Sequence, residues 1–374
     1  MSSSICPGAC SGRGPRGMAG GAAPPPRGRA GLERRPRGSW LGGAATALAL
    51  GLALAAAVPA CRAANTAINT AGACSTAPNE AACAGSAPSS TESDYSAISA
   101  AAARDWGHSP ARRVVTLAPS LTELVYAAGG GDRLVGTVTS SDYPPSARRL
   151  PRVGDGINIG LERLLSLKPD LVLAWQASGA TRALAPTLGT LRIPLQYLAP
   201  DSLDGIARDV ARLGGLLGTA VQADAAAAAL ARRIAALRAH YAGRRTVSVL
   251  IEIGSDPLYT IGRDALLNDV LHTCGGVNIY ARSTLAAPQV DAENVLIAKP
   301  DAIITAAAAG GRRRQERQAY WAALRLPAAR AGHVYAIDPD ALFRPGPRLV
   351  QATEDLCRDL DQVRAAMPAA SRKP

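Results

Sequence analysis

The chain has 374 residues, a formal net charge of +12 and an aromatic content of only 4%. Seven arginines against one glutamate in residues 1–60 carry +6 of that charge, so the rest of the chain is only moderately basic. A single phenylalanine and one arginine cluster, over residues 312–317, argue against a nucleic-acid-binding protein, which needs a basic footprint and often stacking aromatics. Four scattered histidines and no G-x-S-x-G turn argue against a metalloenzyme or a hydrolase.

The first 60 residues read as a targeting segment. Several arginines precede the apolar, small-residue run "LGGAATALALGLALAAAVPA", which is typical of a secretory signal peptide. Translation could start at Met1 or at Met18. Cys61 follows in "VPAC", a sequence similar to a bacterial lipobox, so we expect either a lipid attached at Cys61 or release as a soluble periplasmic protein.

Residues 61–111 are rich in Ala, Ser, Thr and Asn and have few apolar anchors. Such a composition predicts a flexible low-complexity tether, because it cannot bury enough apolar surface to fold. Cys74 and Cys83 lie within it, and the sequence leaves open whether they pair.

Short apolar runs alternate with helical patterns from residue 112 to residue 370, which predicts an α/β fold with parallel sheets. We expect an N-terminal lobe over 112–218, a connecting backbone helix over 219–243 and a C-terminal lobe over 244–370. Near the start, Ser120 and Glu123 have the spacing of a capping box.

A repeated pattern supports two similar Rossmann-like lobes. "ERLLSLKPDLVLAW" begins at Glu162 and "ENVLIAKPDAIITA" begins at Glu293, 131 residues later. Each copy predicts the end of a helix, a proline stop and a buried strand. The repeat also places one glutamate near a helix N-terminus on each lobe. Either the pair meets a two-lobed partner, or each glutamate merely favours its own helix.

The chain resembles the periplasmic binding proteins of bacterial cobalamin ABC importers. These belong to a helical-backbone class whose members also carry iron–siderophores and haem. The resemblance covers roughly residues 112–368 and rests on the motifs "RVVTLAPSLTEL", "SDYPP", "LERLLSLKPDLVLAW", "HTCGGVNIY", "PQVDAENVL" and "RPGPRLV". It implies two lobes around a ligand cleft, and a monomer that binds cobalamin as cargo without any cofactor.

The same resemblance assigns residues to the cleft. An aromatic side chain after a turn suits a large flat ligand, and the carboxyl end of a parallel strand is where open α/β sheets place ligands. The residues implied to bind ligand are Tyr143, Trp175, Tyr259, Asp340, Ala341, Leu342, Phe343 and Arg344. Tyr143 and Trp175 have a plainer alternative, as a half-buried turn residue and a core filler.

The resemblance further implies that Glu162 and Glu293 dock onto basic residues of an inner-membrane ABC permease dimer, since carboxylate–arginine contacts are strong and specific. It also implies a disulfide between Cys274 and Cys357, which would stabilise the second lobe by about 2–4 kcal/mol.

Two departures from the resemblance concern the cargo. Close cobalamin binders carry a tryptophan six residues before each docking glutamate, where this chain has Gly156 and Ala287. A wider cleft would suit a different corrinoid, and a ferric siderophore or haem is the alternative cargo. Remoter alternatives are a cell-surface adhesion module and an enzyme.

Overall fold

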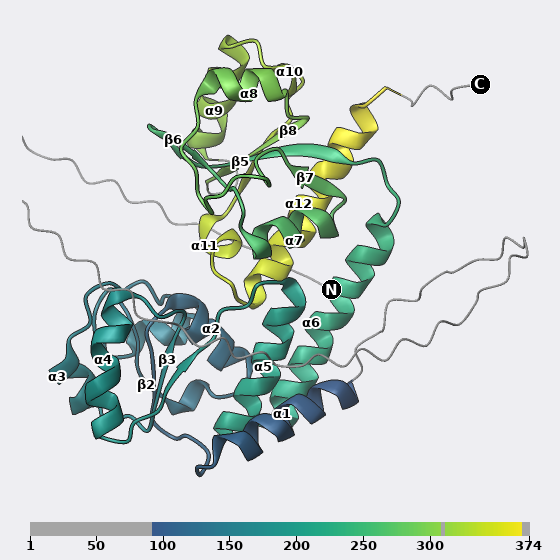
Figure 1. The fold of residues 1–374 in the computed structure, drawn as a ribbon. Coiled ribbons are helices and arrows are strands. Elements are labelled where there is room, and N and C mark those ends of the chain that lie inside the picture. Colours follow the sequence, from purple (N-terminus) through teal and green to yellow (C-terminus); the bar gives the residue numbers. More distant parts are fainter. Residues whose placement is uncertain (1–91, 308–310, 369–374) are drawn as a thin grey trace, which may run out of the picture. The chain divides into compact units, whose positions relative to one another are not determined.

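Two mainly parallel sheets organise residues 92–307 and 311–368, the part of the chain that the computed structural model describes. The predicted signal peptide, Cys61, Cys74 and Cys83 lie outside these residues. Each sheet forms the centre of one lobe, and helix α6 (Ala220–Tyr241) connects the two lobes in the sequence (Figure 1).

The first sheet has the order β2-β1-β3-β4, with every pair of neighbours parallel. All residues of β1 and β3 are buried, as expected for strands covered on both faces. The strands are β1 (Val114–Thr116), β2 (Leu134–Gly136), β3 (Leu171–Ala174) and β4 (Leu195–Tyr197).

The second sheet is built on the long strand β5 (Val247–Ser255). Strands β7 (Gly276–Asn278), β8 (Ala302–Ala306) and β9 (Val334–Ile337) are parallel members, whereas β6 (Leu258–Thr260) pairs with β5 in an antiparallel hairpin. This hairpin, whose turn is the Asp256–Pro257 dipeptide, was not predicted from the sequence.

The helices cover both sheets. The first lobe contains α2 (Pro119–Ala127), α3 (Leu161–Ser166), α4 (Gly179–Thr190) and α5 (Leu203–Leu217), with 3₁₀ turns η1 (Gly131–Arg133) and η2 (Pro145–Arg149). The second lobe contains α7 (Ala265–Thr273), α8 (Ala292–Ala298), α9 (Arg312–Ala323), α10 (Pro327–Arg330), α11 (Pro339–Leu342) and α12 (Pro347–Ala366). The helix α2 begins at Pro119 after Ala118, without a side-chain cap, so Ser120 and Glu123 do not form the predicted capping box.

One apolar cluster runs through both lobes. It includes Leu124 of α2, Val210 of α5, Val249 of β5 and Leu356 of α12, each fully buried. Helix α12 returns from the second lobe to contact α2, α5 and α6. Because packed interiors resist deformation, this shared core should hold the two lobes in a nearly fixed relation.

The expected tether is wrong for residues 92–106, which form α1 (Glu92–Trp106) against α5 and α6 (Figure 1). Alanines that look featureless in sequence are the strongest helix formers, and Tyr95 and Trp106 of this helix are buried. Gly215 of α5 permits the close approach, because a Cβ there would lie 2.1 Å from the Ser99 carbonyl oxygen.

The repeated motif forms the same local structure in both lobes. Lys299 is the C-cap of α8 and Lys168 directly follows the C-cap of α3, and both adopt the left-handed conformation, with φ of 47° and 46°. The Asp170 carboxylate accepts the N–H groups of Arg112 and Arg113 at 2.8 Å. Asp301 likewise accepts the N–H of Ser248 at 2.8 Å. Each aspartate therefore ties the start of its strand to the start of the neighbouring central strand.

Cys274, at the end of α7, and Cys357, in α12, form the predicted disulfide, which closes a sequence separation of 83 residues. Both cysteines are fully buried. Among the described residues, no helix has both the length and the apolar character needed to cross a membrane.

Candidate functional site

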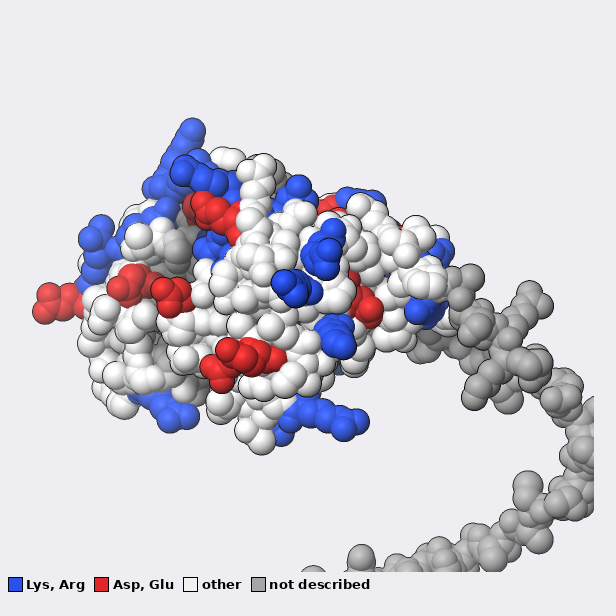
Figure 2. All heavy atoms as spheres, turned by 90° about the horizontal axis from the view of Figure 1, so that it is seen from above, with Lys and Arg blue, Asp and Glu red and all other residues white. Residues whose placement is uncertain are grey.

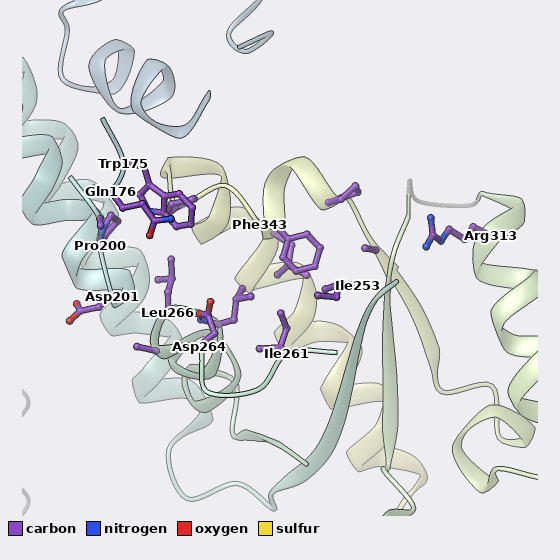
Figure 3. A pocket seen from close by; sticks show the side chains of 17 residues that line it. Trp175, Gln176, Pro200, Asp201, Ile253, Ile261, Asp264, Leu266, Arg313 and Phe343 are labelled. Carbon is purple, nitrogen blue, oxygen red and sulfur yellow. The ribbon is translucent and has the colours of Figure 1, made fainter. Parts of the chain in front are cut away.

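A cavity of about 530 Å³ lies between the two lobes. Its lining comes from the loops after β3 and β4 on one side, and from β5, α7 and the α11 region on the other. Figure 3 shows Trp175 and Gln176 on one side and Phe343, Ile253 and Ile261 facing them from the other.

The first-lobe wall consists of residues that follow parallel strands. Trp175 comes directly after β3, and Pro200 and Asp201 follow β4. Because parallel strands end at the same edge of their sheet, these side chains meet there. Trp175 is 44% exposed, so a large part of its indole ring is available for contact rather than filling the core.

The second-lobe wall is mainly apolar. Ile253 lies in β5, Ile261 follows β6, and Leu342 and Phe343 belong to the end of α11. Asp264 also lines the cavity, and its carboxylate caps α7 by accepting the Leu267 N–H at 2.8 Å. The cap fixes the start of α7 at the cavity.

The charged groups that line the cavity are Asp201, Asp264 and Arg313. In Figure 3, Arg313 stands at the far end, at the start of α9, away from Trp175. Two carboxylates against one guanidinium leave the lining weakly negative, which disfavours an anionic ligand and suits a neutral one.

Next to the cavity, Arg344 bridges the lobes instead of lining it. Its guanidinium lies 2.7 Å from Asp142 of the first lobe and 2.7 Å from Asp340. The hydrogen bond from Arg344 lowers the pKa of Asp142. The donors of Arg344 that were expected to meet the ligand therefore hold the two lobes together.

A second interlobe pair is more deeply buried. Arg348 of α12 donates from Nη2 and Nε to Glu123 of α2 at 2.6 and 2.9 Å, and Glu123 is only 3% exposed. Burial raises the pKa of Glu123, although its contact with Arg348 works in the opposite direction. The Arg348 guanidinium also stacks 4.4 Å from the centre of the Tyr143 ring.

The structure therefore divides the predicted ligand-binding residues. Trp175, Leu342 and Phe343 meet at the cavity. Those that do not line it are Tyr143, Tyr259, Asp340, Ala341 and Arg344. Tyr143 and Tyr259 remain accessible, at 44% and 37% exposed, and the side chain of Asp340 is 47% exposed.

Several residues that line the interlobe cavity were not predicted from the sequence. Gln176, Pro200 and Asp201 follow strands, so the rule that ligands bind at strand carboxyl ends could have found them. Ile253, within β5, and Ile261, directly after β6, flank a hairpin that was not predicted from the sequence.

The two glutamates of the repeat occupy equivalent places on the lobes. Glu162 lies in the first turn of α3, and Glu293 lies in the first turn of α8. Both are exposed, and neither lines the cavity. Each is therefore accessible to a partner, and the docking role itself stays a prediction.

The surface charges are mixed. On the face drawn in Figure 2, several basic side chains gather at one corner, and elsewhere basic and acidic side chains are scattered among uncharged areas. Within residues 92–307 and 311–368, no group of three or more His, Cys, Asp or Glu side chains has the geometry to hold a metal ion.

This architecture is similar to that of known proteins. The periplasmic binding protein family matches residues 114–341. The vitamin B12-binding protein of Photorhabdus laumondii is 38% identical over 249 residues, covering 67% of this chain and 88% of that protein.

Two solved structures share the fold. The crystal structure of the periplasmic vitamin B12-binding protein of Vibrio cholerae is 35% identical with a TM-score of 0.62, over 68% of this chain and 98% of that one. The periplasmic haem-binding protein of Roseiflexus sp. RS-1 is 26% identical with a TM-score of 0.58, over 68% and 99%. With its two α/β lobes, interlobe cavity and matching family signature, this chain belongs to the periplasmic binding protein family.

Proposed function

We propose that this protein is an extracytoplasmic substrate-binding protein that captures cobalamin, or a closely related corrinoid, and delivers it to an ABC permease. The observation that carries the proposal is the aromatic and apolar interlobe cavity in a chain 38% identical to a vitamin B12-binding protein. The protein would act by binding and release, without catalysis and without a cofactor, and as a monomer.

The cavity chemistry fits a neutral, amide-rimmed macrocycle. Trp175 and Phe343 offer aromatic faces for the flat ring, and ligand sites in proteins typically combine such apolar walls with a few polar groups. The carboxylates of Asp201 and Asp264 can accept hydrogen bonds from amide N–H groups, which surround a corrin ring.

Haem or a ferric siderophore is the second candidate, favoured by the fold shared with the haem-binding protein of Roseiflexus. Haem propionates and ferric catecholate siderophores are anionic. Among the described residues that line the cavity, Arg313 is the single cationic side chain, and Arg344 is held by Asp142 and Asp340. The lining therefore supports a corrinoid better than either anionic cargo.

Affinity in this scaffold should come from a preformed site. The core that continues through α5, α6 and α12 limits the relative motion of the lobes, so little binding energy is spent on reorganisation. Delivery would use Glu162 and Glu293, one on each lobe, to pair with basic residues of the permease dimer. The protein would reside in the periplasm after export, either soluble or tethered through a lipid on Cys61.

Equilibrium dialysis against three cargoes tests the assignment. The full chain should retain cyanocobalamin, and neither haemin nor a ferric catecholate siderophore should displace it at equal concentration. Retention of haemin or the siderophore in preference to cyanocobalamin would transfer the assignment to the second candidate.

A further inference from the structure

A second cavity, which we call the side chamber, opens next to the interlobe cavity. It has a volume of about 440 Å³ and lies wholly within the first lobe. Trp175 and Gln176 line both spaces, so the two meet at the indole ring. The remaining walls are the end of β1, the segment at Gly156 and Ile157, and the start of α4.

None of the described residues that line the side chamber carries a charged side chain. A charged group entering it would lose its hydration without gaining a partner, which is strongly unfavourable. Leu117, Pro119 and the 80%-exposed Ile157 supply apolar surface. The polar side chains of the described lining are those of Gln176, Ser178 and Thr181, at or near the N-terminus of α4. These walls select a neutral and largely apolar group with some polar edges.

The exposed indole of Trp175 favours a ligand group that is flat. The indole is 44% exposed and forms the boundary between the two spaces, so a flat ring can stack on it. Heteroaromatic bases stack well on tryptophan and carry hydrogen-bonding edges that a carboxamide such as that of Gln176 can meet.

We propose that the side chamber receives a planar heteroaromatic base carried by the corrinoid, stacked on Trp175, while the corrin ring occupies the interlobe cavity. This inference rests on the proposed cobalamin function. Two parts of a cobalamin carry such a base: the nucleotide below the ring, and the adenosyl group above it in adenosylcobalamin.

The chain offers a matched pair of variants to test this. Gly179 and Gly189 both lie in α4, and a Cβ at either position would meet no atom within 4 Å. Only Gly179 lines the side chamber. Helical side chains lean toward the helix N-terminus, so Phe at position 179 should fill the chamber, whereas Phe at position 189 should extend into solvent.

The experiment measures the affinities of the wild type, Gly179→Phe and Gly189→Phe for three ligands by titration calorimetry. Cyanocobalamin carries the lower base, dicyanocobinamide lacks it, and adenosylcobalamin carries both the lower base and the adenosyl group. Thermal melting checks that each variant is folded, and Gly179→Leu replaces Gly179→Phe if the larger side chain prevents folding.

We expect Gly179→Phe to weaken a base-bearing ligand by about 10-fold or more, as loss of one stacked base implies, and to leave dicyanocobinamide and Gly189→Phe unchanged. Weakening of both cobalamins identifies the lower base, and weakening of adenosylcobalamin alone identifies the adenosyl group. Equal weakening of dicyanocobinamide, no weakening of any ligand, or the same effect in Gly189→Phe would overturn the inference. A wild type that binds none of the three would instead refute the proposed function.

Discussion

Replacing Arg348 by methionine should leave Glu123 as a buried carboxylate without its main partner. In the wild type, Arg348 donates two hydrogen bonds of 2.6 and 2.9 Å to Glu123, and Glu123 is only 3% exposed. Removing one partner of a buried pair typically costs about 3–5 kcal/mol. The low end, about 3 kcal/mol, is expected, because Arg344 lies 3.8 Å from the same carboxylate and keeps part of the compensation.

Urea denaturation of the wild type and Arg348→Met at pH 7 measures this loss in the free energy of unfolding. In a thermal melt, a loss of about 3 kcal/mol corresponds to a fall of roughly 6–12 °C for a domain of this size. The double variant Glu123→Leu/Arg348→Met is the control. It should recover most of the loss, because apolar replacement of a whole buried pair is often neutral.

The pH dependence provides an independent check. Burial already raises the pKa of Glu123, and the Arg348 contacts that oppose this rise disappear in Arg348→Met. The folded variant should then bind a proton more tightly than the unfolded chain, so its stability falls as the pH rises above the unfolded pKa of Glu. The deficit should be larger at pH 7 than at pH 5. A loss below about 1 kcal/mol at pH 7, or an equal loss at both pH values, would refute the reasoning.

Three further changes test other parts of the structure. Changing both Cys274 and Cys357 to serine should lower the free energy of unfolding by about 2–4 kcal/mol in urea, and a change below 1 kcal/mol would show that the bridge is dispensable. Asp209→Asn should stabilise the protein by about 1–3 kcal/mol at pH 7 but little at pH 4. Burial raises the pKa of Asp209 to about 6, so its ionisation in the folded state opposes folding as the pH rises. Equal stabilisation at both pH values would contradict this. Reversing Glu162 and Glu293 together to lysine should abolish cobalamin uptake by cells while leaving the affinity of the purified protein unchanged, and uptake that survives the change would remove both residues from the docking role.

Local patterns predicted the lobes well. Each copy of the glutamate-to-aspartate repeat forms a helix, a lysine in the left-handed backbone conformation and a buried strand. Trp175 reached the cavity because its position after a parallel strand is a local consequence of the fold. The disulfide between Cys274 and Cys357 was expected from a resemblance and is present.

Long-range partners were not predictable in the same way. Glu123 looked like part of a capping box, yet it pairs with Arg348, 225 residues away. Arg344 looked like a ligand contact, yet its charge is matched by Asp142 from the other lobe. Helix α1 looked like a tether, because its own composition does not reveal the packed surface on α5 and α6 that it covers. In each case tertiary contacts outweighed the local signal.

Titration calorimetry of the full chain with cyanocobalamin, repeated with Trp175→Ala, tests the central claim most directly. We expect one corrinoid per chain at micromolar affinity or tighter, and binding at least about 10-fold weaker when the exposed indole is removed. A folded wild type that gives no binding heat, and retains no cyanocobalamin in dialysis, would contradict the claim that this interlobe cavity is a corrinoid site.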